Sequence, residues 1–339
     1  METLNSNTIK DFFIKVLNDQ NVAITTKLVE TKVDVYDLAV QVNDQTLIIE
    51  FKNEVFPKDV TSLTKQSAQS KHPLLVIANY ITPKAKEQLI ESQINYLDRA
   101  ENIYLKLSNL LLKIEGNKNS SIKEKYKSRA FSKTGAAVVF QFLLDPRAVN
   151  HPQRTIAKMA NVSLGTIPKV FEGLLKDKFL IKDTDTSYRL INYKALLEKW
   201  IPVFNEKVLP NYKIGTYTFS RYNNTNWKDQ LAYPQVFWGG EPGAALLTKY
   251  LNPEKFTLFT TKTKQQILTE LKLVPDTNGE ITIYQSFWDT YTLQTAIDLI
   301  AEKNTAPPVL IYAQLLYSGN ERNIETAQII FDDYIKNKL

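Results

Sequence analysis

The first 116 residues alternate between helix-like and strand-like hydrophobic patterns. A helical stripe is formed by Ile9, Phe12, Phe13, Val16 and Leu17. Strand-like runs follow at 33–42 and 46–52, then a helix at 58–69, a strand at 74–78, a helix at 83–92 and a strand at 103–107. Because helices and strands that alternate along a chain pack as layers around one sheet, the pattern predicts an α/β module.

Two of these strand-like runs are joined by Asn43-Asp44, a dipeptide typical of two-residue hairpin turns. Such a turn places only apolar residues on one face of the hairpin. On the other face, Asp37 lies opposite Glu50, and Lys52 follows two residues further along the same face. A shift of one residue would mix the two faces, so the hydrophobic pattern itself favours this register.

This predicted arrangement of two carboxylates and a lysine is suited to a metal site. Adjacent carboxylates are costly to hold together without a cation, and Mg²⁺ prefers oxygen ligands. A lysine beside them could orient or deprotonate an attacking water, or stabilise charge at a phosphate. The arrangement Asp37…Glu50-Phe51-Lys52 resembles the D…(D/E)xK core of the PD-(D/E)xK, or restriction-endonuclease-like, nucleases. The resemblance implies that Asp37 and Glu50 bind metal, that Lys52 assists phosphodiester cleavage, and that Gln66 matches a glutamine present in some members.

The simpler alternative is an exposed charged strand on which Glu50 pairs with Lys52. Glu-x-Lys is common on strands, and Asp11 lies off the apolar stripe of the first helix, where it matches poorly the acid that many of these nucleases add. Both interpretations stay open at this stage, so a Mg²⁺-dependent nuclease is the enzymatic alternative to a role without catalysis.

The positive charge is concentrated in the middle of the chain. The formal net charge is +6, yet residues 119–200 hold 15 Lys or Arg against 7 Asp or Glu, and both flanking segments are close to neutral. Residues 117–132 form a basic linker rich in Asn, Ser and Lys that leads into this segment. The layout predicts a central module that faces a polyanion, with an unevenly charged solvated surface as the alternative.

Residues 133–200 have the pattern of a winged helix-turn-helix. The expected elements are a helix at 134–144, a helix at 153–160, a turn at Asn161-Val162, a helix at 163–178 capped by Ser163, and strands at 179–182 and 187–191. The core face of the third helix is predicted to hold Ile167, Val170, Phe171, Leu174 and Leu175. In this motif the helix after the turn enters the major groove of DNA.

Two sets of residues are predicted to contact double-stranded DNA, and no cofactor is required. The set near the start of the third helix, where base edges are reached, is Ser163, Thr166 and Lys169. The flanking set, suited to phosphates, is Lys158, Lys182 and Arg189. Since phosphate contacts release counterions, binding is expected to weaken steeply with salt. A winged helix that binds protein is the alternative, and the basic charge favours DNA.

Residues 201–339 have a mixed α/β pattern. We expect helices at 243–250, 264–271 and 309–316, further helices from about 292 and 324, and strands at 256–260 and 280–284. Gly239-Gly240 before a helix could hold phosphate, but without a P-loop lysine a tight turn is the better interpretation. The aromatic residues expected in the core are Trp227, Phe237, Trp238, Phe287 and Trp288. The expected modules are thus 1–116, 133–200 and 201–339, with 117–132 as the linker.

The composition excludes several kinds of chemistry. The chain has no cysteine and two histidines, His72 and His151, which excludes disulfides, thiolate nucleophiles and histidine-rich metal centres. Residues 1–17 lack the basic start and apolar run of a signal peptide, and no apolar stretch approaches the ~20 residues of a membrane span. We expect a cytoplasmic protein that does not bind membranes.

Several motifs recur together in one bacterial family. They are Leu47–Lys52, Asn95–Asp98, Ser163–Gly165, Gly239–Thr248 and Arg322–Ala327. With these motifs the chain resembles the AbiEi-like antitoxins of type IV toxin–antitoxin systems, in the version with an endonuclease-like module in front of a winged helix. The resemblance implies a DNA-binding repressor of its own operon whose C-terminal domain opposes a nucleotidyltransferase toxin encoded nearby.

Two positions depart from the pattern of that family. Relatives tend to have Gly-Asn where this chain has Glu101-Asn102, and often have Asp where it has Gln314. Two other functions stay open: a Mg²⁺-dependent DNA nuclease of phage defence targeted by the same winged helix, and an interaction scaffold that touches no DNA. The oligomeric state is also open, with a homodimer as one arrangement.

Overall fold

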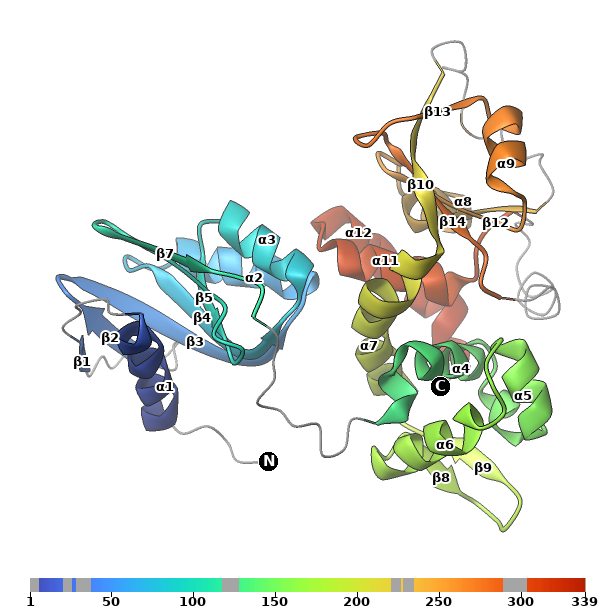
Figure 1. The fold of residues 1–339 in the computed structure, drawn as a ribbon, viewed down its shortest axis with the longest axis horizontal. Coiled ribbons are helices and arrows are strands. Elements are labelled where there is room, and N and C mark those ends of the chain that lie inside the picture. The colour runs from blue at the N-terminus through green and yellow to red at the C-terminus, as the bar shows by residue number, and fades with distance from the viewer. Residues whose placement is uncertain are drawn as a thin grey trace. The chain divides into compact units, whose positions relative to one another are not determined.

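The computed structural model describes residues 6–20, 26–28, 38–117, 128–220, 227, 235–288 and 304–338. The chain divides into two compact units, an N-terminal unit (Met1–Lys125) and a C-terminal unit (Tyr126–Leu339). Each unit has hydrophobic cores of its own among these residues. Figure 1 shows the elements of both units.

The N-terminal unit is a mixed α/β sandwich. Its elements are α1 (Ser6–Asp19), β1 (Thr26–Leu28), β2 (Leu38–Val42), β3 (Gln45–Val55), α2 (Pro57–Ala68), β4 (Leu74–Ile81), α3 (Pro83–Glu91), β5 (Asn95–Asp98), β6 (Ile103–Leu107) and β7 (Leu110–Ile114). These strands form one sheet in chain order, in which β3, β4 and β5 run parallel. Helix α1 packs on one face through Phe13 and Val16, and α2 and α3 pack on the other through Leu63 and Leu89 (Figure 1).

Local sequence explains how these elements begin and turn. Helices α2 and α3 both start on a proline, whose missing N–H is not needed at a first helical position. The turn between β2 and β3 contains Asn43 in the left-handed region, with φ of 51°. The predicted hairpin register is confirmed from the pair Leu38–Ile49 to the pair Val42–Gln45. Asp37 lies outside the described residues, so its place opposite Glu50 stays a prediction.

The first half of the C-terminal unit contains four helices and a small hairpin. Its elements are α4 (Lys133–Leu144), α5 (Gln153–Met159), α6 (Thr166–Lys176), β8 (Leu180–Lys182), β9 (Tyr188–Leu190) and α7 (Tyr193–Val203). Short 3₁₀ turns stand at Arg129–Phe131 and Pro146–Asn150. Figure 1 shows α4, α5 and α6 grouped with the β8–β9 hairpin. The order of these elements along the chain is the one that the sequence predicts.

The second half of the C-terminal unit is built on a five-stranded sheet. Its elements are β10 (Lys213–Phe219), β11 (Val236–Gly239), α8 (Gly240–Thr248), β12 (Phe256–Thr260), α9 (Lys264–Glu270), β13 (Leu273–Pro275), β14 (Ile281–Gln285), α11 (Pro308–Ser318) and α12 (Glu321–Ile330). The strand order is β11-β12-β14-β10-β13. The predicted helix from about 292 lies outside the part of the chain that the structure describes.

The two halves of the C-terminal unit share one hydrophobic core. Trp200 of α7 stacks on Phe140 of α4 and on Phe204, with ring centroids 5.8 and 4.7 Å apart. Phe140 also lies 5.4 Å from Phe287, which in turn contacts Trp288 beside the C-terminal sheet. The Trp200 indole N–H donates to the Ala136 carbonyl at 2.8 Å. Of the aromatic residues predicted to be core, Phe237, Trp238 and Trp288 are buried and Trp227 and Phe287 are half-buried. The contacts of Phe287 join α4 and α7 to the sheet.

Two predicted helix starts and one predicted core-face residue are wrong. Helix α6 begins at Thr166, and Ser163 does not cap it, because the Thr166 N–H that such a cap would bind already donates to the Ser163 carbonyl at 2.9 Å. Leu175 lies about 100° around the helix from buried Leu174 and is 38% exposed, so it is not on the core face. Helix α8 begins at Gly240, three residues earlier than expected.

Candidate functional site

The turn that precedes α6 is open to solvent. Ser163, Leu164 and Gly165 are exposed, Thr166 is half-buried, and Lys169 one turn later is exposed. The Ser163 and Thr166 hydroxyls lie 3.0 Å apart. The structure therefore leaves the three residues predicted to reach base edges on the surface, as a DNA contact requires.

Buried contacts hold this turn in place. Asn161 adopts the left-handed region, with φ of 49°, and reverses the chain between α5 and α6. The buried Gln141 of α4 donates to the Met159 carbonyl at the end of α5, at 3.1 Å. Ile156 of α5 and Ile167 of α6 are fully buried. The exposed turn thus rests on a fixed base, which keeps its side chains in a defined position.

Three exposed cations surround the turn without carboxylate partners among the described residues: Arg154, Lys158 and Lys169. Arg154 and Lys158 lie four residues apart and so occupy the same face of α5. Arg154 was not among the residues predicted from the sequence to contact DNA. The pattern that could have indicated it is its spacing of four residues from Lys158, on the side of α5 away from the apolar pair Ile156 and Ala157.

The cations of the β8–β9 hairpin are paired. Lys182 lies 3.1 Å from Asp185, and Arg189 lies 3.1 Å from Asp183. Hydrogen bonding to Asp183 raises the pKa of the Arg189 guanidinium. The two cations of the hairpin are therefore neutralised by its own aspartates, in contrast to Arg154 and Lys158 of α5.

The N-terminal unit brings three of the predicted catalytic residues together. Glu50 and Lys52 project from β3 toward the face that α2 covers, and Gln66 reaches them from α2. Lys52 Nζ donates to Glu50 Oε1 at 2.5 Å, and Gln66 Nε2 donates to Glu50 Oε2 at 3.1 Å. Asp11 is not part of this group, because α1 packs on the opposite face of the sheet.

In the part of the chain that the structure describes, protein side chains take up the hydrogen-bonding capacity of Glu50. Both oxygens of Glu50 accept hydrogen bonds, one of them from a lysine ammonium that stands where a cation would bind. Among the described residues, no three His, Cys, Asp or Glu side chains come together as a metal site requires. The pairing of Glu50 with Lys52 is the one that the alternative interpretation names, but the Glu50 side chain is only 12% exposed. Asp37 lies outside the described residues, so neither interpretation is decided.

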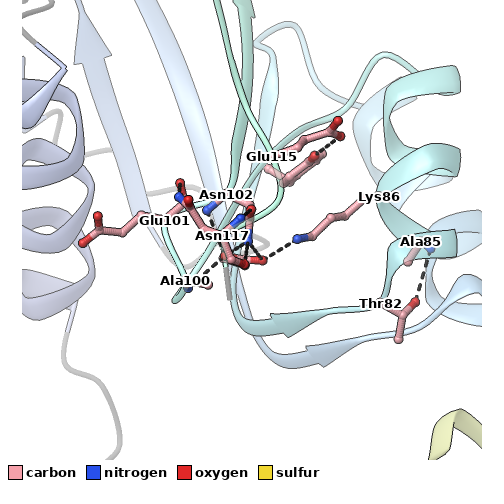
Figure 2. A network of polar contacts seen from close by, with 10 residues as sticks. Thr82, Ala85, Lys86, Ala100, Glu101, Asn102, Glu115 and Asn117 are labelled. Carbon is pink, nitrogen blue, oxygen red and sulfur yellow. Dashed lines mark hydrogen bonds and ion pairs between the residues drawn. The ribbon is translucent and has the colours of Figure 1, made fainter. Parts of the chain in front are cut away.

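A second polar cluster, centred on Asp98, ties the end of the N-terminal unit together (Figure 2). The buried Asp98 carboxylate accepts from Lys86 at 2.5 Å and from the Asn102 amide at 2.9 and 3.0 Å. Asn102 also exchanges two hydrogen bonds with the Asn117 backbone, at 2.8 and 3.1 Å. Every oxygen of Asp98 is thus used by the fold, so this motif holds structure and does not present a reactive group.

The Gly-rich motif of the C-terminal sheet is also structural. Gly240, with φ of 47°, starts the buried helix α8, and its N–H donates to Gln314 Oε1 at 2.8 Å. Glu241 is buried, accepts from two backbone N–H groups after α8, and bonds Asn323 of α12 at 3.0 Å. Because Gln314 occupies the helix start that a phosphate would need, the tight turn is the better interpretation, as expected.

One comparison with known proteins gives a match. Residues 189–336 match the model of a family described as "Transcriptional regulator, AbiEi antitoxin, Type IV TA system". The motifs Gly239–Thr248 and Arg322–Ala327 lie within this match, while Leu47–Lys52, Asn95–Asp98 and Ser163–Gly165 precede it. No curated protein and no solved structure matches the chain.

Among the described residues, no helix has the length and the apolar composition that a membrane span requires.

Proposed function

We propose that the chain is a DNA-binding transcription regulator of the antitoxin type, which reads duplex DNA through a winged helix-turn-helix. In this assignment α5 and α6 are the two helices of the helix-turn-helix, α6 enters the major groove, and the β8–β9 hairpin is the wing. The family match at residues 189–336 supports the regulator and antitoxin class for the C-terminal half of the chain.

The observation that carries the proposal is the exposed, neutral turn before α6, flanked by unpaired cations. Ser163 and Thr166 present hydroxyls that can bond base edges, and Lys169 follows on the next turn. Arg154 and Lys158 face outward from α5, where phosphates would pass. Lys182 and Arg189 can add phosphate contacts once they leave their aspartates.

The biological role proposed is repression of the operon that encodes the chain, with a nucleotidyltransferase toxin as the activity opposed. A DNA regulator needs no catalytic group, and the bonded state of Glu50, Lys52 and Gln66 is consistent with that. A nucleotidyltransferase in the neighbouring reading frame would support the antitoxin part of the proposal.

Titration of the chain against its own upstream region tests DNA binding. We expect a labelled duplex from this region to bind more tightly than a scrambled duplex of equal length, and the affinity to fall steeply between ~50 and ~200 mM salt. Equal binding of both duplexes, or retention that salt does not change, would overturn the proposal and favour an interaction scaffold.

A Mg²⁺-dependent DNA nuclease is the second candidate function. The observation that favours it is the approach of Gln66 to Glu50 and Lys52, the group that the resemblance to restriction-endonuclease-like proteins predicts. Incubation of the chain with plasmid and Mg²⁺ or Mn²⁺, beside the Glu50→Ala variant, tests it. Cleavage by the parent chain that the variant lacks would establish the nuclease, and intact plasmid in both samples would reject it.

A further inference from the structure

The exposed turn before α6 carries an apolar side chain at its tip. Leu164 is 44% exposed, and its neighbours Ser163 and Gly165 are exposed as well, so no side chain beside it in sequence shields it. Residues 161–169 contain no acidic residue, and the cations nearest in sequence are Lys158 and Lys169 at the two sides. The surface is therefore neutral and apolar at its tip and positive at its margins.

Gly165 has no structural reason to be a glycine. Its φ of −65° is open to every residue, and a Cβ added there would meet no atom within 4 Å. Its backbone lies in the right-handed helical region, with φ of −65° and ψ of −7°, where a residue with a Cβ loses less conformational entropy on folding than glycine does. Glycine also serves where a ligand must come close to the backbone, and the open space over Gly165 fits that use.

We propose that Leu164 determines sequence specificity by packing on the 5-methyl group of a thymine, with Gly165 allowing the close approach. The inference rests on the proposed DNA-binding function and adds what is read. In the major groove a thymine is distinguished by its methyl group, to which apolar side chains bind, whereas guanine is read by Arg or Lys. The tip offers leucine and two hydroxyls and no cation, so the contact of Leu164 selects a thymine. Lys158 meets a phosphate at one side, and Lys169 remains the cation assigned to a neighbouring base edge.

Replacement of thymine by deoxyuridine, one position at a time, removes only the methyl group and tests the contact. With the parent chain we expect a loss of about fourfold in affinity at one position of the bound site, the effect of one methyl group left unburied. Leu164→Ala is expected to bind the thymine duplex more weakly and to show no further loss at that deoxyuridine.

Leu175→Ala is the matched control, since it makes the same change at the other end of α6, where the side chain is 38% exposed. It is expected to keep the full deoxyuridine effect. Gly165→Ser supplies a second readout: the variant should melt at the same temperature or higher, because the added Cβ meets no atom and lowers the entropy lost on folding, yet bind DNA at least tenfold more weakly.

Two results would overturn the assignment of Leu164 while leaving DNA binding intact. One is sequence-specific binding by the parent chain with no loss at any deoxyuridine. The other is a deoxyuridine effect that persists unchanged in Leu164→Ala. Loss of all preference for the upstream region over a scrambled duplex is a different outcome, which rejects the proposed function itself.

Discussion

The division between unpaired cations on α5 and paired cations on the β8–β9 hairpin predicts where DNA affinity comes from. Two double variants compare them directly. Arg154→Gln with Lys158→Gln removes two charges that no carboxylate neutralises among the described residues. Lys182→Gln with Arg189→Gln removes two charges that Asp185 and Asp183 already hold at 3.1 Å. Because both variants lower the net charge by two, any difference between them reports position rather than total charge.

The expected magnitude follows from counterion release. Each lost phosphate contact lowers the slope of log affinity against log salt by about 0.9, so the α5 variant is expected to lose about 1.8 in slope. Over a fourfold change in salt, from ~50 to ~200 mM, that difference amounts to about a tenfold smaller loss of affinity than in the parent chain. The hairpin variant should change the slope by less than half as much, since its cations contact phosphate only after leaving a carboxylate.

Fluorescence anisotropy with one labelled duplex at four or five salt concentrations measures all three slopes. The α5 variant should give the shallowest line, and the hairpin variant should run nearly parallel to the parent chain. Equal slopes for the two variants would refute the reasoning, because they would show that the aspartates of the hairpin do not compete with phosphate. A steeper line for the α5 variant than for the hairpin variant would refute it as well.

Three stability predictions follow from single contacts, each measured by urea unfolding. Glu101 has φ of 64°, so Glu101→Gly should be more stable than Glu101→Ala by about 1 kcal/mol. Both variants lose the ion pair with Lys15, so equal stability would contradict the cost of the left-handed backbone. Trp200→Phe should destabilise the C-terminal unit by about 1–3 kcal/mol, because the hydrogen bond to Ala136 is lost and the ring is smaller. The unfolding transitions followed by fluorescence and by circular dichroism should shift together. Separate transitions would count against a shared core. Gln314→Leu leaves the Gly240 N–H without its acceptor and should lower the free energy of unfolding by about 1–3 kcal/mol. Gln314→Glu keeps an acceptor at the helix start and should lower it much less. Similar losses of stability in both variants would show that this hydrogen bond is not the cause.

The hairpin of β2 and β3 could be predicted from sequence to the residue. Asn43-Asp44 fixes a two-residue turn, and the apolar face allows one register only, so two independent local signals agree. The strands β1, β5 and β7 of the N-terminal unit were missed, as were β10, β11 and β13 of the C-terminal sheet. Strand β5 has four residues, all buried, and such a short apolar run carries no period that separates a strand from a helix.

The candidate site was predicted less completely, for physical reasons that particular residues illustrate. Ser163 precedes a helix and has a hydroxyl that could cap it. The Thr166 N–H donates instead to the Ser163 carbonyl, and the helix begins three residues later than predicted, at Thr166. The pairing of Lys182 and Arg189 with aspartates depends on how the hairpin turn folds, which composition does not reveal. Gln66 was predicted from the resemblance to the restriction-endonuclease-like nucleases. Its separation of 16 residues from Glu50 carries no local sequence signal.

Glu101 is a residue with a full side chain held in the left-handed region, with φ of 64°. Its side chain points toward α1 and pairs with Lys15 at 3.2 Å (Figure 2). Gln314 accepts the Gly240 N–H through its amide oxygen, a bond that a carboxylate at this position could accept as well.

The aromatic stack that joins α4 and α7 to the C-terminal sheet limits how this chain can be divided or recombined. A fragment cut after Trp200 would lose Phe204 and Phe287, and would expose the ring faces of Trp200 and Phe140 to water. The segment from α4 to α7 therefore cannot be moved alone: a graft onto another protein must include the residues after β14 with Phe287 and Trp288, or supply rings of the same shape.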